Sequence, residues 1–247
     1  MQLRSFSRLG KIVLSACVAV LLAGCGVRSI SNSDYFADSD RGYRHRDSPF
    51  YKGELSELDI LGIDAKSAIS EADIEQSLAS KSRLVIPKGS SLMLIQSGAM
   101  IPDDGMVKGL EKYYNVSVFT GVPADAMPGS GYSKALRLAA ARSGQDKLLV
   151  YWGLLETGSQ DLASKAVSWI PFIGGAVPDE TQRMRIRMKV AVVDVTSGRW
   201  DMFSPEPFED IDSSARYTRV SSYQGQVATL KDKAYRATVG DLGKRYS

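Results

Sequence analysis

The sequence predicts an α/β fold: a mixed sheet flanked by helices, with a parallel first part, an antiparallel hairpin and a C-terminal helix. Helix-like and strand-like segments alternate between residues 70 and 152, which is typical of a sheet covered by helices. Residues 184–190 alternate strictly between apolar and basic side chains, as in a half-buried strand. A turn at 194–198 then leads to a second run at 199–203, which predicts the hairpin.

The helices of the first part are recognised by their ends. Residues 70–78 begin with Ser70, whose hydroxyl can cap the helix, and acidic residues favour its positive end. A second helix is expected from Pro102 to Tyr114. A third is expected over the alanine-rich residues 133–142, because Gly144 stops it.

The strands between these helices are short apolar runs. The last of them, 147–152, is continuously apolar and therefore indicates a strand that is buried on both faces. An apolar stripe over residues 227–234 predicts the final helix. The strands expected in this part of the chain lie at 84–86, 92–95, 116–119 and 147–152.

The amino terminus has the pattern of a secretory signal. Residues 1–11 carry three basic residues and no acidic one, and the apolar run 12–22 that follows is too short to cross a bilayer. The run ends in Leu22-Ala23-Gly24-Cys25, which resembles the lipobox of bacterial lipoproteins. This resemblance implies cleavage before Cys25 and attachment of diacylglycerol to its thiol, with fatty acyl chains such as palmitate. The alternative is an inert cysteine in an ordinary signal or anchor helix.

We therefore divide the chain into a lipoprotein signal peptide at 1–24, a lipidated tether at 25–54 and one α/β domain at 55–247. The tether is predicted to be flexible because it is poor in aliphatic residues and rich in Ser, Asp, Arg and Gly, and its scattered aromatic residues leave open that part of it packs on the domain. Lipid on Cys25 would hold the protein on a membrane without spanning it. Gly26 resembles the outer-membrane pattern of Gram-negative lipoproteins, with the domain in the periplasm.

Composition limits the partners of the mature chain. Removing residues 1–24 takes away three of the 31 basic residues, which leaves 28 against 28 acidic residues. A formal net charge of zero argues against nucleic acid as a partner. Cys17 leaves with the signal and Cys25 carries lipid, so no disulfide is expected and the apolar core must stabilise the fold.

The sequence offers no convincing catalytic site. Its single histidine, His45, lies in the predicted tether, which argues against Ser-His-Asp and Cys-His arrangements. No zinc-binding spacing and no phosphate loop occurs, so we expect neither metal nor cofactor. An envelope hydrolase such as a peptidase remains the alternative function, which metal analysis and a peptidase screen would test.

Two segments are candidates for binding a partner. An apolar insert at 158–182 is longer than a connection between strands requires, so it is either a docking loop or a segment packed on the core. On the alternating strand, a stripe of basic residues either binds an anionic partner or forms the solvent-exposed face of the strand. The partner-binding residues are Trp169, Ile170, Phe172 and Ile173 in the insert, and Arg185 and Arg187 in the stripe.

The folded part also resembles a known group of envelope lipoproteins. The alanine-rich helix that leads into residues 147–153, followed by the turn Asp194-Val195-Thr196-Ser197-Gly198, is similar to the CsgG and LpoB-type lipoproteins and to the amino-terminal domain of TolB. The resemblance covers residues 84–204 and transfers no functional residue. It implies a non-enzymatic adaptor or accessory factor that docks on another envelope component, an unknown envelope protein, and leaves a homo-oligomer open.

Overall fold

A long hairpin forms the centre of the fold. The computed structural model describes residues 25–33, 36–37, 44–45, 48, 50–64, 68–79, 83–123, 130–161, 178–215 and 219–247. In it β6 (Lys147–Asp161) and β7 (Pro178–Asp194) pair antiparallel from Lys147 opposite Asp194 to Asp161 opposite Glu180. Both strands are too long for one set of neighbours, so the sheet has two halves along the hairpin.

The proximal half has the strand order β5-β4-β6-β7-β8. β4 (Ser91–Gln96) is parallel both to β5 (Asn115–Phe119) and to β6. β8 (Trp200–Phe203) is antiparallel to β7 and closes this half. The predicted mixed sheet, parallel first and then closed by an antiparallel hairpin, is therefore confirmed.

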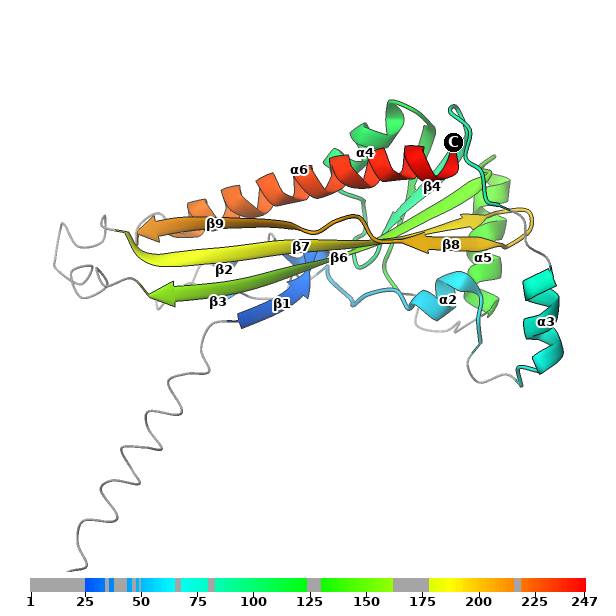
Figure 1. Ribbon diagram of the computed structural model, residues 1–247, viewed down its shortest axis with the longest axis horizontal. Helices are drawn as coiled ribbons and strands as arrows, with labels where there is room; N and C mark the ends of the chain where they lie inside the picture. Colours follow the sequence, from blue (N-terminus) through cyan, green and yellow to red (C-terminus); the bar gives the residue numbers. More distant parts are fainter. Residues whose placement is uncertain are drawn as a thin grey trace, which may run out of the picture.

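The distal half has the order β1-β6-β7-β9. β1 (Cys25–Ser29) occupies the edge of β6 beyond β4, and β9 (Phe208–Ala215) occupies the edge of β7 beyond β8. Both strands are antiparallel to their partners. Figure 1 shows this half at the left, where β6, β7 and β9 reach away from the body and β1 lies beneath them.

One long helix covers one face of both halves. α6 (Arg219–Tyr246) runs along β7 and β9, and α4 (Asp104–Glu111) packs beside it (Figure 1). α2 (Glu57–Leu61) and α5 (Ser130–Arg142) lie on the opposite face, but only over the proximal half. In the described part of the chain, no helix covers that face of the distal half.

The core consists of two apolar layers, one on each side of the sheet. The layer under α6 includes Leu149, Tyr151, Ile186, Val190, Val227 and Leu230, and the layer under α5 includes Ile60, Leu136, Leu148, Val150, Ala191 and Val193. Consecutive residues of β6 and β7 alternate between these layers, because side chains of a strand point to opposite faces. The remaining elements are η1 (Ile30–Asn32), β2 (Phe36–Ala37), β3 (Arg44–His45) and the exposed helix α3 (Glu71–Ala79).

The strand predicted at 84–86 is wrong. Leu84 and Ile86 are buried, but their segment joins no sheet. Instead the Ile86 backbone N–H donates to the Tyr246 carbonyl at 2.7 Å, at the end of α6. The last carbonyls of a helix lack partners within the helix, so this contact satisfies one of them.

The amino-terminal segment also differs from the sequence-based prediction. We expected a flexible tether from Cys25, whereas Cys25–Ser29 is a strand of the sheet and the buried Ile30 follows it. The boundaries of the insert differ as well. Residues 158–161 extend β6 and residues 178–182 belong to β7, because their backbones pair with each other and with the edge strands.

The turn after β7 is stabilised by a carboxylate that accepts several hydrogen bonds. Asp194 Oδ1 accepts bonds of 2.7 Å from both the backbone N–H and the hydroxyl of Ser197, and Lys147 Nζ lies 2.9 Å from Oδ2. Burial raises the pKa of Asp194, but these Ser197 hydrogen bonds and the Lys147 charge outweigh it and lower the pKa from 3.8 to about 2.

We expect Asp194→Asn to lower the free energy of unfolding by about 2 kcal/mol at neutral pH, because each unit of pKa shift corresponds to about 1.4 kcal/mol. The pKa is lower in the folded state, so this stabilisation is complete above pH 4. It is lost as the pH falls through the range from about 4 to about 2. Urea melts of both proteins across this range are the measurement, and a stability gap that stays constant down to pH 2 would contradict it.

Candidate functional site

Cys25, the predicted lipid attachment residue, is the first residue of β1. It lies opposite Gly158 of β6; Gly158 lies opposite Arg183 of β7, and Arg183 opposite Ile211 of β9. Directly paired residues of neighbouring strands share a face of the sheet. Cys25 therefore occupies a row that crosses the whole distal half.

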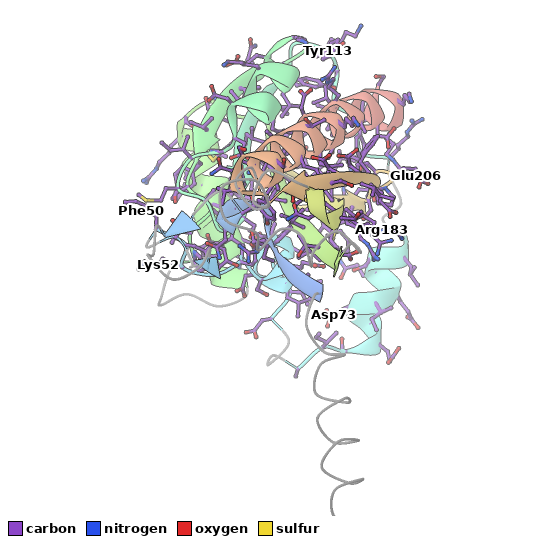
Figure 2. The ribbon with its side chains drawn as sticks, turned by 90° about the vertical axis from the view of Figure 1, so that its left-hand side faces the viewer. Phe50, Lys52, Asp73, Tyr113, Arg183 and Glu206 are labelled. Carbon is purple, nitrogen blue, oxygen red and sulfur yellow. The ribbon has the colours of Figure 1, made fainter. Side chains whose placement is uncertain are left out.

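The next row on the same face, toward the body, carries three charged side chains. It consists of Val27, Glu156, Arg185 and Glu209, again directly paired from β1 to β9. These rows lie on the face that α6 leaves uncovered, because the residues between them, such as Met184 and Ile186, are buried under α6. Figure 2, viewed from the hairpin end, shows Arg183 on the side of β7 away from α6.

We call this surface the open face. It is exposed in the described structure and combines charged with apolar side chains. Val27 is 67% exposed, Ile211 is 55% exposed and Leu154 is 46% exposed. Its members are Val27, Leu154, Glu156, Gly158, Arg183, Arg185, Arg187, Lys189, Glu209 and Ile211.

The basic side chains of the open face have acidic partners. Arg185 Nε donates to Glu156 Oε2 at 2.6 Å, and Arg187 Nε lies 3.0 Å from Glu156 Oε1. Arg183 Nε lies 3.2 Å from Glu209 Oε1. Lys189 also pairs with Glu57 of α2. The stripe is therefore a network of four basic and three acidic side chains that contact one another across the elements.

A shallow hollow of about 340 Å³ lies within the open face, beside β1. Its lining includes Val27, Glu156, Gly158, Arg183 and Arg185. Gly158 has no side chain to fill the hollow. A Cβ added at this position would have no atom within 4 Å, so it would point into open space. The hollow thus lies in the same row of the sheet as Cys25.

The segment after β1 attaches Cys25 firmly to the core. Ile30 is 1% exposed and packs on Gly153 of β6, where an added Cβ would lie 2.4 Å from Ile30 Cδ1. Ser31 Oγ donates to the Ser97 carbonyl at 2.6 Å and accepts from Gln96 Nε2 at 3.0 Å. Side-chain packing and hydrogen bonds therefore fix the chain within a few residues of Cys25.

A buried polar network extends from this attachment into the core. The Tyr151 hydroxyl donates to Gln96 Oε1 at 2.5 Å, and burial raises the pKa of Tyr151 well above its usual value. Asp103 accepts a bond of 2.5 Å from the Tyr235 hydroxyl and lies 3.1 Å from Lys231 Nζ. A neutral tyrosine and a paired carboxylate are suited to stabilising the fold.

The residues that the sequence singled out fall into separate groups. Arg185 and Arg187 lie on the open face, and both contact Glu156. Trp169, Ile170, Phe172 and Ile173 lie outside the described residues. Within the described ranges, no group of three or more His, Cys, Asp and Glu side chains is close enough to hold a metal ion. The described helices include none with the length and apolar character to span a bilayer.

Sequence reasoning missed Val27, Glu156 and Ile211. β1 has only five residues and β9 is rich in polar residues, so neither has the apolar alternation that predicts a strand. Glu156 had one available signal, since the alternation of 184–190 requires a partner strand of similar length. Extending β6 beyond 152 would have placed Glu156 beside the arginines.

The comparisons with known proteins find one matching family model. It is the YafT bacterial lipoprotein model, which matches residues 56–245. No curated protein matches the chain.

Several solved structures are distantly similar, and three of them illustrate the likeness. The PelC dodecamer from Paraburkholderia phytofirmans is 11% identical with a TM-score of 0.26, covering 64% of this chain and 93% of that one. A putative neuraminyllactose-binding hemagglutinin homolog from Helicobacter pylori is 12% identical with a TM-score of 0.28, covering 68% and 90%. Lipoprotein GNA1162 from Neisseria meningitidis is 15% identical with a TM-score of 0.23, covering 56% and 99%.

These structural likenesses are too low to assign a function. The family model covers most of the chain, including α2, every strand from β4 to β9 and nearly all of α6. It confirms the prediction of a bacterial lipoprotein. The chain belongs to the YafT family of bacterial lipoproteins.

Proposed function

We propose that the protein is a lipid-anchored, non-enzymatic adaptor of the outer membrane, with lipid on Cys25 and its domain in the periplasm. The observation that carries this proposal is the position of Cys25 at the start of β1, in the same sheet as the open face. A lipid there brings the distal half to the membrane. The adaptor then presents its remaining surfaces to another envelope component.

The insert is the first candidate for contacting that component. It connects the ends of β6 and β7 and contains Trp169, Ile170, Phe172 and Ile173. Aromatic side chains often dominate the binding energy of protein interfaces. Capture by site-specific photocrosslinking from the insert, in native membranes, identifies the partner, and repeated recovery of lipid alone would argue against a protein partner.

We expect the double variant Trp169→Ala with Phe172→Ala to lose the captured partner while its melting temperature hardly changes. If the two rings instead packed on the core, their loss would lower the free energy of unfolding by about 3–5 kcal/mol each. Thermal melts and crosslinking of the same preparation separate the two outcomes.

Trp200→Ala with Phe50→Ala is a matched control, because both side chains are exposed and lie elsewhere in the structure. This control should retain both the fold and the partner. A large fall in melting temperature for the insert variant, with partner capture unchanged, would show that the insert packs on the core and does not bind the partner.

A further inference from the structure

We propose that the open face is the membrane-facing side of the domain and rests on the phospholipid headgroups of the bilayer that holds the Cys25 lipid. This inference rests on the proposed function, since it requires lipid on Cys25. It adds a definite orientation to the anchoring: α6 faces away from the membrane, and the uncovered side of β1, β6, β7 and β9 faces it.

Cys25 is itself the first residue of an edge strand of the sheet. Cys25 pairs with Gly158, so no free segment separates the anchor from the folded domain. Neighbouring strands lie about 4.8 Å apart, which places Arg183 roughly 10 Å and Ile211 roughly 14 Å from Cys25 along their row. The headgroup region of one leaflet is only about 5–8 Å thick. A sheet fixed to lipid at this point therefore stays within reach of the bilayer surface.

The two faces of the distal half differ in how much of their surface the described elements cover. α6 already covers one face of the distal half, and its side chains there are buried. The other face exposes Val27, Leu154 and Ile211 beside the charged network. Amphipathic helices bind membrane interfaces by burying apolar side chains and by attraction between basic side chains and anionic lipid groups, and this face of the sheet offers both contributions.

The charge pattern of the open face fits zwitterionic headgroups. The open face and Glu57 together carry four basic side chains and three acidic ones, in alternating contact. A phospholipid headgroup such as phosphatidylethanolamine also carries both signs. Guanidinium groups can bind its phosphate, and Glu156 or Glu209 can accept from its ammonium group. The hollow beside Gly158 offers space for such a headgroup in the row of Cys25.

The test uses the mature lipidated protein in vesicles of phosphatidylethanolamine and phosphatidylcholine that contain a headgroup-attached nitroxide quencher. Cys17 leaves with the signal and Cys25 carries lipid, so the mature chain holds no other thiol and accepts a single fluorescent label. One variant carries the label at Ile211→Cys on the open face. The matched variant carries it at Thr229→Cys, an exposed position of α6.

We expect strong quenching at position 211 and background quenching at position 229. In a third protein labelled at Leu154→Cys, an exposed position of the open face further from Cys25, Ile211→Asp should reduce the membrane-contacting population about tenfold or more, since burial of an isoleucine side chain favours contact by at least that factor. Ile101→Asp, which replaces an exposed isoleucine of the proximal half, should leave it unchanged.

Mass spectrometry of the same preparations separates two kinds of failure. A mature protein without lipid on Cys25 overturns both the proposed function and this orientation. Lipid on Cys25 together with equal quenching at 211 and 229 overturns the orientation alone. Crosslinking of position 211 to a protein in native membranes, with no lipid quenching, assigns the open face to a protein partner and also overturns the orientation.

Discussion

Cys25→Ser is expected to abolish lipidation completely. The hydroxyl of serine cannot replace the thiol as the acceptor of diacylglycerol, so the precursor keeps residues 1–24 and yields no lipidated product. Mass spectrometry of the amino terminus measures this directly. Cys17→Ser is the matched control, because Cys17 lies within the predicted signal and should be removed normally. An unmodified amino terminus at a residue other than Cys25 in the wild-type protein would contradict the assignment.

The same pair of variants tests the location of the protein. Several acyl chains give stable membrane attachment, with each buried methylene contributing about 0.8 kcal/mol, whereas a single chain gives only reversible binding. We expect the wild-type protein and Cys17→Ser to sediment with the outer membrane when the two membranes are separated by density. Recovery of the lipidated wild-type protein with the inner membrane would overturn the outer-membrane part of the proposal.

Gly153→Val is expected to cause the largest loss of stability among the variants proposed here. An added Cβ at this position would lie 2.4–2.9 Å from three carbons of Ile30, so the whole side chain must leave its site. Removing a buried isoleucine side chain from its site costs about 1.5–3 kcal/mol of lost burial, and the empty site adds to this. Because Ile30 follows β1 directly, its displacement should also release the segment that carries Cys25.

Gly158→Val is the matched control for this variant. It lies in the same strand, opposite Cys25, but an added Cβ there meets no atom within 4 Å. Urea melts should show a large fall in stability for Gly153→Val and little change for Gly158→Val. Hydrogen exchange of residues 25–33 should increase only in the first variant, and unchanged exchange in both would show that Ile30 does not hold β1 in place.

Much of the proximal half is predictable from local sequence. The capped helix at 71–79, the alanine-rich α5 and the apolar strands β4 and β5 each have their own pattern of periodicity or end signals. The alternation of Met184, Ile186, Met188 and Val190 predicts β7, because one face of that strand is buried under α6. The family assignment agrees with the Leu22-Ala23-Gly24-Cys25 motif, another local signal.

The distal half was decided only by tertiary structure. β1 and β9 are polar segments that become strands because they satisfy the free edges of β6 and β7, and such pairing depends on residues more than 100 positions away in the case of β1. The sequence therefore determined that this protein is a lipoprotein with a mixed α/β domain. Only the register of four strands placed Cys25, Gly158, Arg183 and Ile211 in one row, because hydrogen bonds between distant segments set which residues lie opposite each other.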